Sequence, residues 1–79
     1  MNAYWKYQYH GHLIEVKNST NHTELYCDGI LLDKQKGLIS VSLAGVLPEG
    51  EQLTAEVKAG FVPKCSVQVY GTALEEIEE

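Results

Sequence analysis

Residues 25–32 have the sequence LYCDGILL, in which Asp28-Gly29 separates two short apolar runs. An Asp-Gly pair between apolar residues favours a two-residue type I′ turn, because the backbone twist of that turn matches the twist of the flanking strands. We therefore predict a β-hairpin with strands over 24–27 and 30–32. A period-two alternation of apolar and polar residues, which is typical of half-buried strands, continues on both sides of this hairpin.

Towards the N-terminus, residues 5–9 (WKYQY) and 12–17 (HLIEVK) each alternate in this way. The pair His10-Gly11 between them predicts a second tight turn, since glycine readily takes a positive φ. The aromatic residues of the first run share one face, and we expect that face in the core because large rings fill a small sandwich well. The polar residues 18–23 are expected to form a loop.

Towards the C-terminus, strands are predicted at 38–44, 52–58 and 65–70. Residues 33–37 are expected to form a polar turn, 45–50 a loop and 60–63 a turn. Strand-like runs recur about every ten residues, which is typical of an all-β sandwich or small barrel. We predict a single antiparallel β-sandwich of about seven strands, with a flattened barrel as the alternative fold.

The predicted sandwich covers residues 1–71, and residues 72–79 form an acidic C-terminal tail with four glutamates. The expectation for this tail is a frayed end. Leu74 and Ile77 lie three positions apart, so a short amphipathic turn that docks on the sandwich is the alternative.

The chain has 79 residues, six lysines, no arginine and a formal net charge of -5. This composition argues against nucleic acid as a partner, because phosphate contacts require clustered basic residues. No apolar run reaches the length of a membrane span, so we expect no membrane partner. Met1 is not followed by a signal-peptide pattern, which makes a cytoplasmic location the expectation.

Three histidines and two cysteines are the residues with the greatest potential for chemistry. The cysteines, Cys27 and Cys65, lie in apolar runs and are expected to be buried free thiols, with a disulfide as the alternative. His10, His12 and His22 together with either cysteine form the hypothetical ligand set of a metal protein or a small enzyme. Their spacing matches no zinc motif, and no serine lies on a nucleophile elbow, so we expect no catalytic residue and no cofactor.

The tyrosines outside the aromatic stripe are Tyr4, Tyr26 and Tyr70. We expect them on the surface, where they would form an interaction surface or, in the alternative, stack against a carbohydrate or another small ligand. A chain of this size has a small core, so association into a homodimer through an edge strand also remains open.

The order of Trp5, Gly11, Ile14-Glu15 and the hairpin of residues 25–29 resembles the opening of one module of the Fas apoptotic inhibitory molecule family. Residues 67–71 (VQVYG) resemble that module's closing strand, and the similarity covers most of residues 5–74. The chain is also similar to short bacterial hypothetical proteins of this size. The resemblance implies an antiparallel β-sandwich without catalytic residues, in a family linked with protein interaction. The sequence therefore favours a small, non-catalytic interaction or scaffold module.

Overall fold

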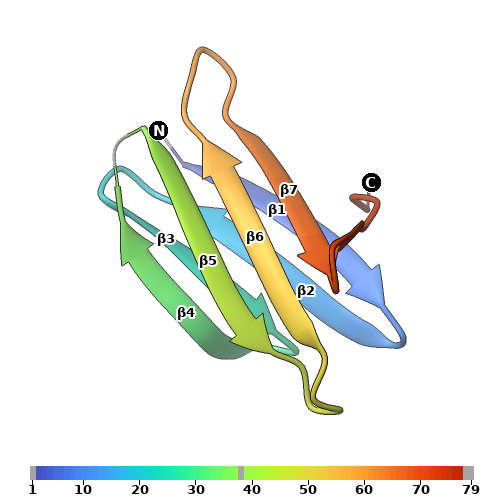
Figure 1. Cartoon of the computed structure of the whole chain (residues 1–79). Helices are drawn as coiled ribbons and strands as arrows, with labels where there is room; N and C mark the ends of the chain where they lie inside the picture. Colours follow the sequence, from blue (N-terminus) through green and yellow to red (C-terminus); the bar gives the residue numbers. More distant parts are fainter. Residues whose placement is uncertain (1, 38, 78–79) are drawn as a thin grey trace.

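The computed structural model describes residues 2–37 and 39–77 of the chain. These residues contain eight β-strands: β1 (Ala3–Tyr9), β2 (His12–Asn18), β3 (His22–Cys27), β4 (Ile30–Lys36), β5 (Ser40–Val46), β6 (Gln52–Lys58), β7 (Lys64–Val69) and the short β8 (Thr72–Ala73). Figure 1 labels all of them except β8. No helix that could span a membrane is found within the described ranges.

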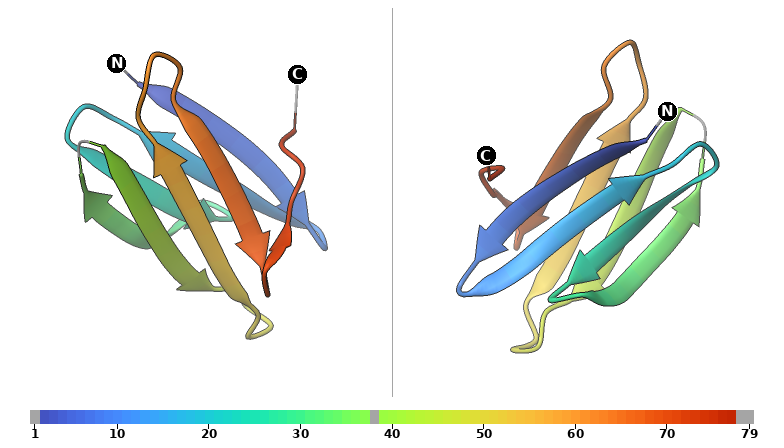
Figure 2. Two further views of the ribbon diagram at one scale, coloured as in Figure 1. Left: turned by 45° about the horizontal axis from the view of Figure 1, so that its top comes forward. Right: turned by 180° about the vertical axis from the view of Figure 1, so that it is seen from behind.

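The strands form two antiparallel four-stranded sheets in which each strand pairs with its neighbour in sequence, β1-β2-β3-β4 and β5-β6-β7-β8. Figure 2 shows the two sheets stacked face to face. The antiparallel sandwich is therefore confirmed. The flattened-barrel alternative is wrong for the described residues, because the strands remain in two separate sheets.

Tight turns with positive φ close three of the hairpins. At the predicted Asp28-Gly29 turn the φ angles are 51° and 81°, the left-handed values that a type I′ turn requires. His10-Gly11 and Tyr70-Gly71 have the same pattern. The first two turns confirm the prediction. The third joins β7 to β8, a strand that alternation did not indicate because it has only two residues.

The core lies between the sheets, and its buried residues come from every long strand except the edge strand β4, which contributes the partly buried Leu32. Tyr7 is only 2% exposed, and its hydroxyl crosses the core to donate a hydrogen bond to the carbonyl oxygen of Cys65 at 3.3 Å. Trp5 and Tyr9 pack against the same core, so the aromatic stripe is in the interior as predicted. The other buried apolar residues are Ile14, Val16, Leu25, Cys27, Val41, Leu43, Leu47, Leu53, Ala55, Val57, Val67 and Val69.

Strand β4 is longer than predicted, because residues 33–36 pair with β3 instead of forming a polar turn. An edge strand faces water on one side, so polar residues are compatible with it. A bulge between Leu25 and Tyr26 shifts the register and leaves Leu32 unpaired, with its side chain against the core. Similarly, β2 and β3 leave only 19–21 as a loop, and β5 continues to Val46.

The chain after residue 71 belongs to the sandwich. Thr72–Ala73 pairs with β7, and the N–H of Leu74 donates to the carbonyl of Val67 at 2.9 Å. The chain then reaches β1 of the other sheet, where Glu76 bridges Tyr7 (Figure 2). Residues 72–77 are therefore not frayed, and they dock in extended form instead of as an amphipathic turn. Residues 78–79 of the predicted tail, Leu38 of a predicted strand and Met1 lie outside the described residues.

Candidate functional site

The two ends of the sandwich differ in chemistry. One end carries the turns at His10-Gly11, Asp28-Gly29 and Tyr70-Gly71 together with the loop 47–51, and lies at the bottom of Figure 1. The opposite end carries the loop 59–63, which projects at the top of the figure. Ionisable side chains meet at the first end, and apolar side chains are exposed at the second, so each end is a candidate site.

His12 connects the two sheets at the first end. It is the first residue of β2 and pairs with Tyr9, which places its ring on the inner side of the sheet. Nδ1 lies 2.7 Å from Oδ2 of Asp28, and Nε2 lies 2.8 Å from Oε1 of Glu49. Asp28 belongs to the β3–β4 turn, whereas Glu49 belongs to the β5–β6 loop. Nearby, the hydroxyl of Tyr9 donates to the carboxylate of Glu51, a second contact between the sheets.

The electrostatics of this cluster follow from these contacts. The hydrogen bonds to Glu49 and Asp28 raise the pKa of His12 above its usual value. The pKa of Asp28 is lowered, first by the hydrogen bond from the N–H of Leu13 to its carboxylate and then by His12. His12 likewise lowers the pKa of Glu49. The arrangement favours the ionised carboxylates beside the imidazole.

Cys27 lies beside this cluster at the end of β3 and is 3% exposed. Its Sγ is 3.9 Å from Oδ2 of Asp28. One donor atom each from His12, Cys27 and Asp28 lies within 4.8 Å of the other two. Burial raises the pKa of the Cys27 thiol, and the neighbouring Asp28 carboxylate raises it further. A buried thiol of this kind is a poor nucleophile at neutral pH.

The structure separates the other members of the predicted ligand set. His10 occupies the β1–β2 turn, where its ring stacks on Tyr9 with centroids 4.1 Å apart. His22 begins β3 and lies at the opposite end of that strand from Cys27. Both cysteines are free, which excludes the disulfide alternative in this structure, and Cys65 lies near the start of β7. Of the predicted set, only His12 and Cys27 come together.

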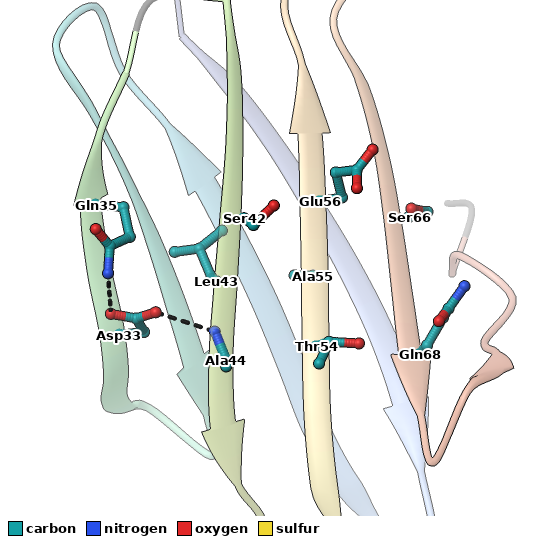
Figure 3. Close-up of a pocket in the computed structure, with 10 residues that line it drawn as sticks. All are labelled: Asp33, Gln35, Ser42, Leu43, Ala44, Thr54, Ala55, Glu56, Ser66 and Gln68. Carbon is teal, nitrogen blue, oxygen red and sulfur yellow. Dashed lines mark hydrogen bonds between the residues drawn. The ribbon is translucent and has the colours of Figure 1, made fainter.

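A polar hollow of about 460 Å³ lies over the outer face of β5, β6 and β7 and reaches across to β4 (Figure 3). Its polar lining includes Ser42, Ser66, Thr54, Glu56 and Gln68. No aromatic residue is among its described lining, so the tyrosines do not form a stacking platform here. The hollow therefore does not support the predicted aromatic ligand site.

The three tyrosines of the predicted interaction surface do not form one patch. Tyr4 and Tyr26 lie on the outer face of the β1–β4 sheet, where Nζ of Lys17 is 4.7 Å from the ring centroid of Tyr26. The hydroxyl of Tyr4 donates to the carboxylate of Glu15, which raises the pKa of Tyr4 to about 12. Tyr70 is exposed in the β7–β8 turn of the other sheet.

The second end carries an exposed apolar tip, which we define as Ile39, Phe61 and Val62. Their exposed fractions are 80%, 104% and 72%. The N–H of Ala59 donates to the carbonyl of Ile39 at 2.7 Å, so the start of β5 is held beside the loop 59–63. Lys58 and Lys64 lie opposite each other at the base of this loop.

No family model, curated protein or solved structure matches the chain. The resemblance to the Fas apoptotic inhibitory molecule modules therefore stays a prediction.

Sequence reasoning missed Glu49 and Asp28 as partners of His12, and it interpreted residues 60–63 (GFVP) only as a turn. Glu49 follows a proline in a polar loop, so its sequence context is that of an ordinary solvated acid. The apolar tip did leave a signal, because Phe61 and Val62 stand between turn residues and outside any alternating strand. Because Phe61 and Val62 lie outside the strands, no alternation of inward and outward side chains places them in the core.

Proposed function

We propose that this protein is a non-catalytic interaction module that docks on a partner protein through its apolar tip. The observation that carries the proposal is the full exposure of Phe61 on a projecting loop, at the end of the sandwich that also exposes Val62 and Ile39. Exposed apolar groups gathered in one region are costly in water and commonly mark interaction sites. Burying one phenylalanine side chain is worth about 1.5–3 kcal/mol, so the tip suits the central anchor of an interface.

The charge at the base of the tip supports a partner with an acidic rim. Lys58 and Lys64 face each other across β6 and β7, and like charges in directly opposite positions destabilise a sheet. Nζ of Lys58 lies 3.5 Å from the exposed carboxylate of Glu56. An acidic group on the partner would relieve this repulsion. We therefore commit to a protein that offers an apolar pocket with carboxylates around it.

Other routes of association are less favoured. The edge of β1 is bridged by Glu76 at Tyr7, and the edges of β4 and β5 face each other, which leaves only short edges, such as residues 64–66 of β7, to the predicted homodimer among the described strands. A second copy docking its acidic end on the tip would make a head-to-tail contact, which forms an open filament unless the rotation between copies closes a ring. The net charge of -5 opposes approach to an anionic membrane.

The test places a photo-crosslinking phenylalanine derivative at position 61 and, as a matched control, at exposed position 70 in the opposite end. Illumination in the source cells is expected to give one adduct from position 61 and none from position 70. Mass spectrometry then identifies the partner, and purified partner should bind the wild-type chain at least ten times more tightly than a Lys58→Glu, Lys64→Glu variant.

Three outcomes would overturn the proposal. An adduct of twice the chain's own mass would assign the tip to self-association. Flotation of the chain with phosphatidylserine vesicles, but not with phosphatidylcholine vesicles, would assign it to a membrane. Equal crosslinking from positions 61 and 70 would show that the tip has no specific role.

A further inference from the structure

We propose that His12 Nδ1, Cys27 Sγ and Asp28 Oδ2 bind a zinc-class divalent metal ion at the end of the sandwich opposite the apolar tip, with the fourth position open to water. The ligand set differs from the histidine cluster that the sequence suggested, since it contains one histidine, one cysteine and one aspartate. It is also independent of the proposed docking function, because no residue of the apolar tip takes part.

The donor atoms are already close to a metal-binding geometry. One donor atom of each residue lies within 4.8 Å of a donor atom of the other two, and Nδ1 of His12 and Sγ of Cys27 are 2.7 Å and 3.9 Å from the same Asp28 oxygen. Bonds of about 2.0–2.3 Å in a tetrahedral site place ligand atoms roughly 3.3–3.8 Å apart. Metal binding therefore requires the Nδ1–Oδ2 distance to increase and the Sγ–Oδ2 distance to decrease, each by no more than about 1 Å.

The backbone around the ligands is held firmly. Cys27, the last residue of β3, pairs with Ile14 of β2 on one side and with Ile30 of β4 on the other. Asp28 is fixed by two hydrogen bonds to Leu13, because its N–H donates to the carbonyl of Leu13 at 2.8 Å and its Oδ1 accepts from the N–H of Leu13 at 2.9 Å. Two of the three ligands are adjacent in sequence at the start of a tight turn, so one hairpin presents both to His12.

Glu49 completes the arrangement as a positioning residue. Its carboxylate lies 2.8 Å from Nε2 of His12, on the far side of the ring from Asp28 and Cys27. When Nε2–H donates to Glu49, the lone pair of Nδ1 is directed towards the proposed ion. A carboxylate on the second nitrogen of a metal-bound histidine is a common feature of zinc sites, and it fixes both the tautomer and the orientation of the ring.

The donor types select the class of ion. Imidazole nitrogen and thiolate sulfur suit zinc and related transition metals, whereas calcium and magnesium prefer sites made of oxygen alone. Binding releases the proton of the Cys27 thiol, together with the proton on Nδ1 of His12 where the ring carries one, to the solvent. The resulting thiolate and the Asp28 carboxylate together balance the charge of a divalent cation. This neutral ligand sphere allows the ion to sit next to the buried Cys27, where an unbalanced charge would be costly.

The test is a titration of the chelator-treated 79-residue chain with Co²⁺, which replaces zinc and reports on its ligands by absorption. The expected result is a saturable thiolate-to-cobalt band in the near ultraviolet at one equivalent, displaced by Zn²⁺. Cys27→Ser should abolish this band, while the matched control Cys65→Ser should keep it. His12→Gln should weaken binding at least tenfold, while His22→Gln should leave it unchanged.

Glu49→Gln separates the positioning role from ligation. It should weaken Co²⁺ binding by roughly 10–100-fold while the thiolate band keeps its shape, and Glu51→Gln should have no effect. Far-UV circular dichroism checks the fold of each variant. If Cys27→Ser fails to fold, the Asp28→Asn and His12→Gln variants decide the outcome. A band that is absent in the wild-type chain, or that follows Cys65 instead of Cys27, would overturn the proposal.

Discussion

The Oδ2 atom of Asp33 on β4 accepts a hydrogen bond from the backbone N–H of Ala44 on β5 at 3.0 Å. The two residues belong to different sheets, so this contact joins the facing edges of the sandwich. Figure 3 shows Asp33 between Gln35 and Ala44, with hydrogen bonds to both. The Asp33 carboxylate thus accepts a backbone N–H on the edge of β5 that would otherwise be available for pairing with a further strand.

Replacing Asp33 with alanine should weaken the fold and expose both edges. Loss of one charge-assisted hydrogen bond at a half-exposed position is expected to cost about 1 kcal/mol, or roughly 4–8 °C in Tm for a domain of this size. Free strand edges promote association, so the variant should also form oligomers in sedimentation experiments. Asp33→Asn keeps an acceptor oxygen and serves as the control. A monomeric Asp33→Ala variant with unchanged Tm would contradict the inference that Asp33 joins and protects the edges of β4 and β5.

Gly45→Ala should destabilise the protein by about 1–3 kcal/mol, the usual cost of overpacking. A Cβ at Gly45 would lie 2.8 Å from Cδ1 and 2.9 Å from Cβ of Leu32. The second contact cannot be relieved by a change of rotamer, because Cβ moves only with the backbone of β4. Combining Gly45→Ala with Leu32→Ala should therefore fail to restore stability in urea unfolding. Full recovery in the double variant would show that the side chain of Leu32 alone causes the clash.

Tyr70→Asn should stabilise the protein. Tyr70 is exposed and has φ 50°, a left-handed conformation that costs an ordinary residue about 1 kcal/mol and costs asparagine less. An Asn-Gly pair is also a favoured type I′ turn. We expect a gain of about 0.5 kcal/mol, or roughly 2–4 °C in Tm. Tyr70→Val should instead lower Tm, because β-branched residues resist positive φ. Equal shifts in the two variants would contradict the role of the turn.

Cys65 should react slowly with alkylating reagents in the native protein. Burial raises its pKa to about 11 from 9.0, so the thiolate fraction at pH 8 falls roughly 100-fold. Mass spectrometry after a short exposure to iodoacetamide should show modification of Cys65 only when urea is present. A native rate equal to the rate in urea would contradict the burial of this thiol.

The raised pKa of Cys65 also predicts how the stability of the fold changes with pH. Because the folded pKa of Cys65 lies above the unfolded value, the native state holds this proton more tightly. The contribution to stability is complete below pH 9 and is lost as the pH rises from about 9 towards 11. Cys65→Ala should flatten this part of the stability profile in thermal unfolding. A profile that is unchanged by the substitution would assign the alkaline loss to other groups.

Local sequence determined much of the fold. The Asp28-Gly29 and His10-Gly11 turns and the alternating strands could be predicted, because turn conformation and the choice of the inward face depend on residues next to each other in the chain. The core aromatic stripe followed from the same alternation. Residues 33–36 were misassigned, since a polar edge strand and a polar turn have the same composition, and only pairing with β3 distinguishes them.

The candidate sites depended on tertiary structure. His12 and Glu49 are 37 positions apart and come from different sheets, so no local pattern connects them. Likewise, Cys27 lies beside His12 while Cys65 does not, because the register of β2 and β3 brings one thiol to that end of the sandwich and β7 carries the other away. The sequence by itself determined which residues form strands and turns. Only the packing of the two sheets decided which side chains meet, since that depends on contacts between residues far apart in the chain.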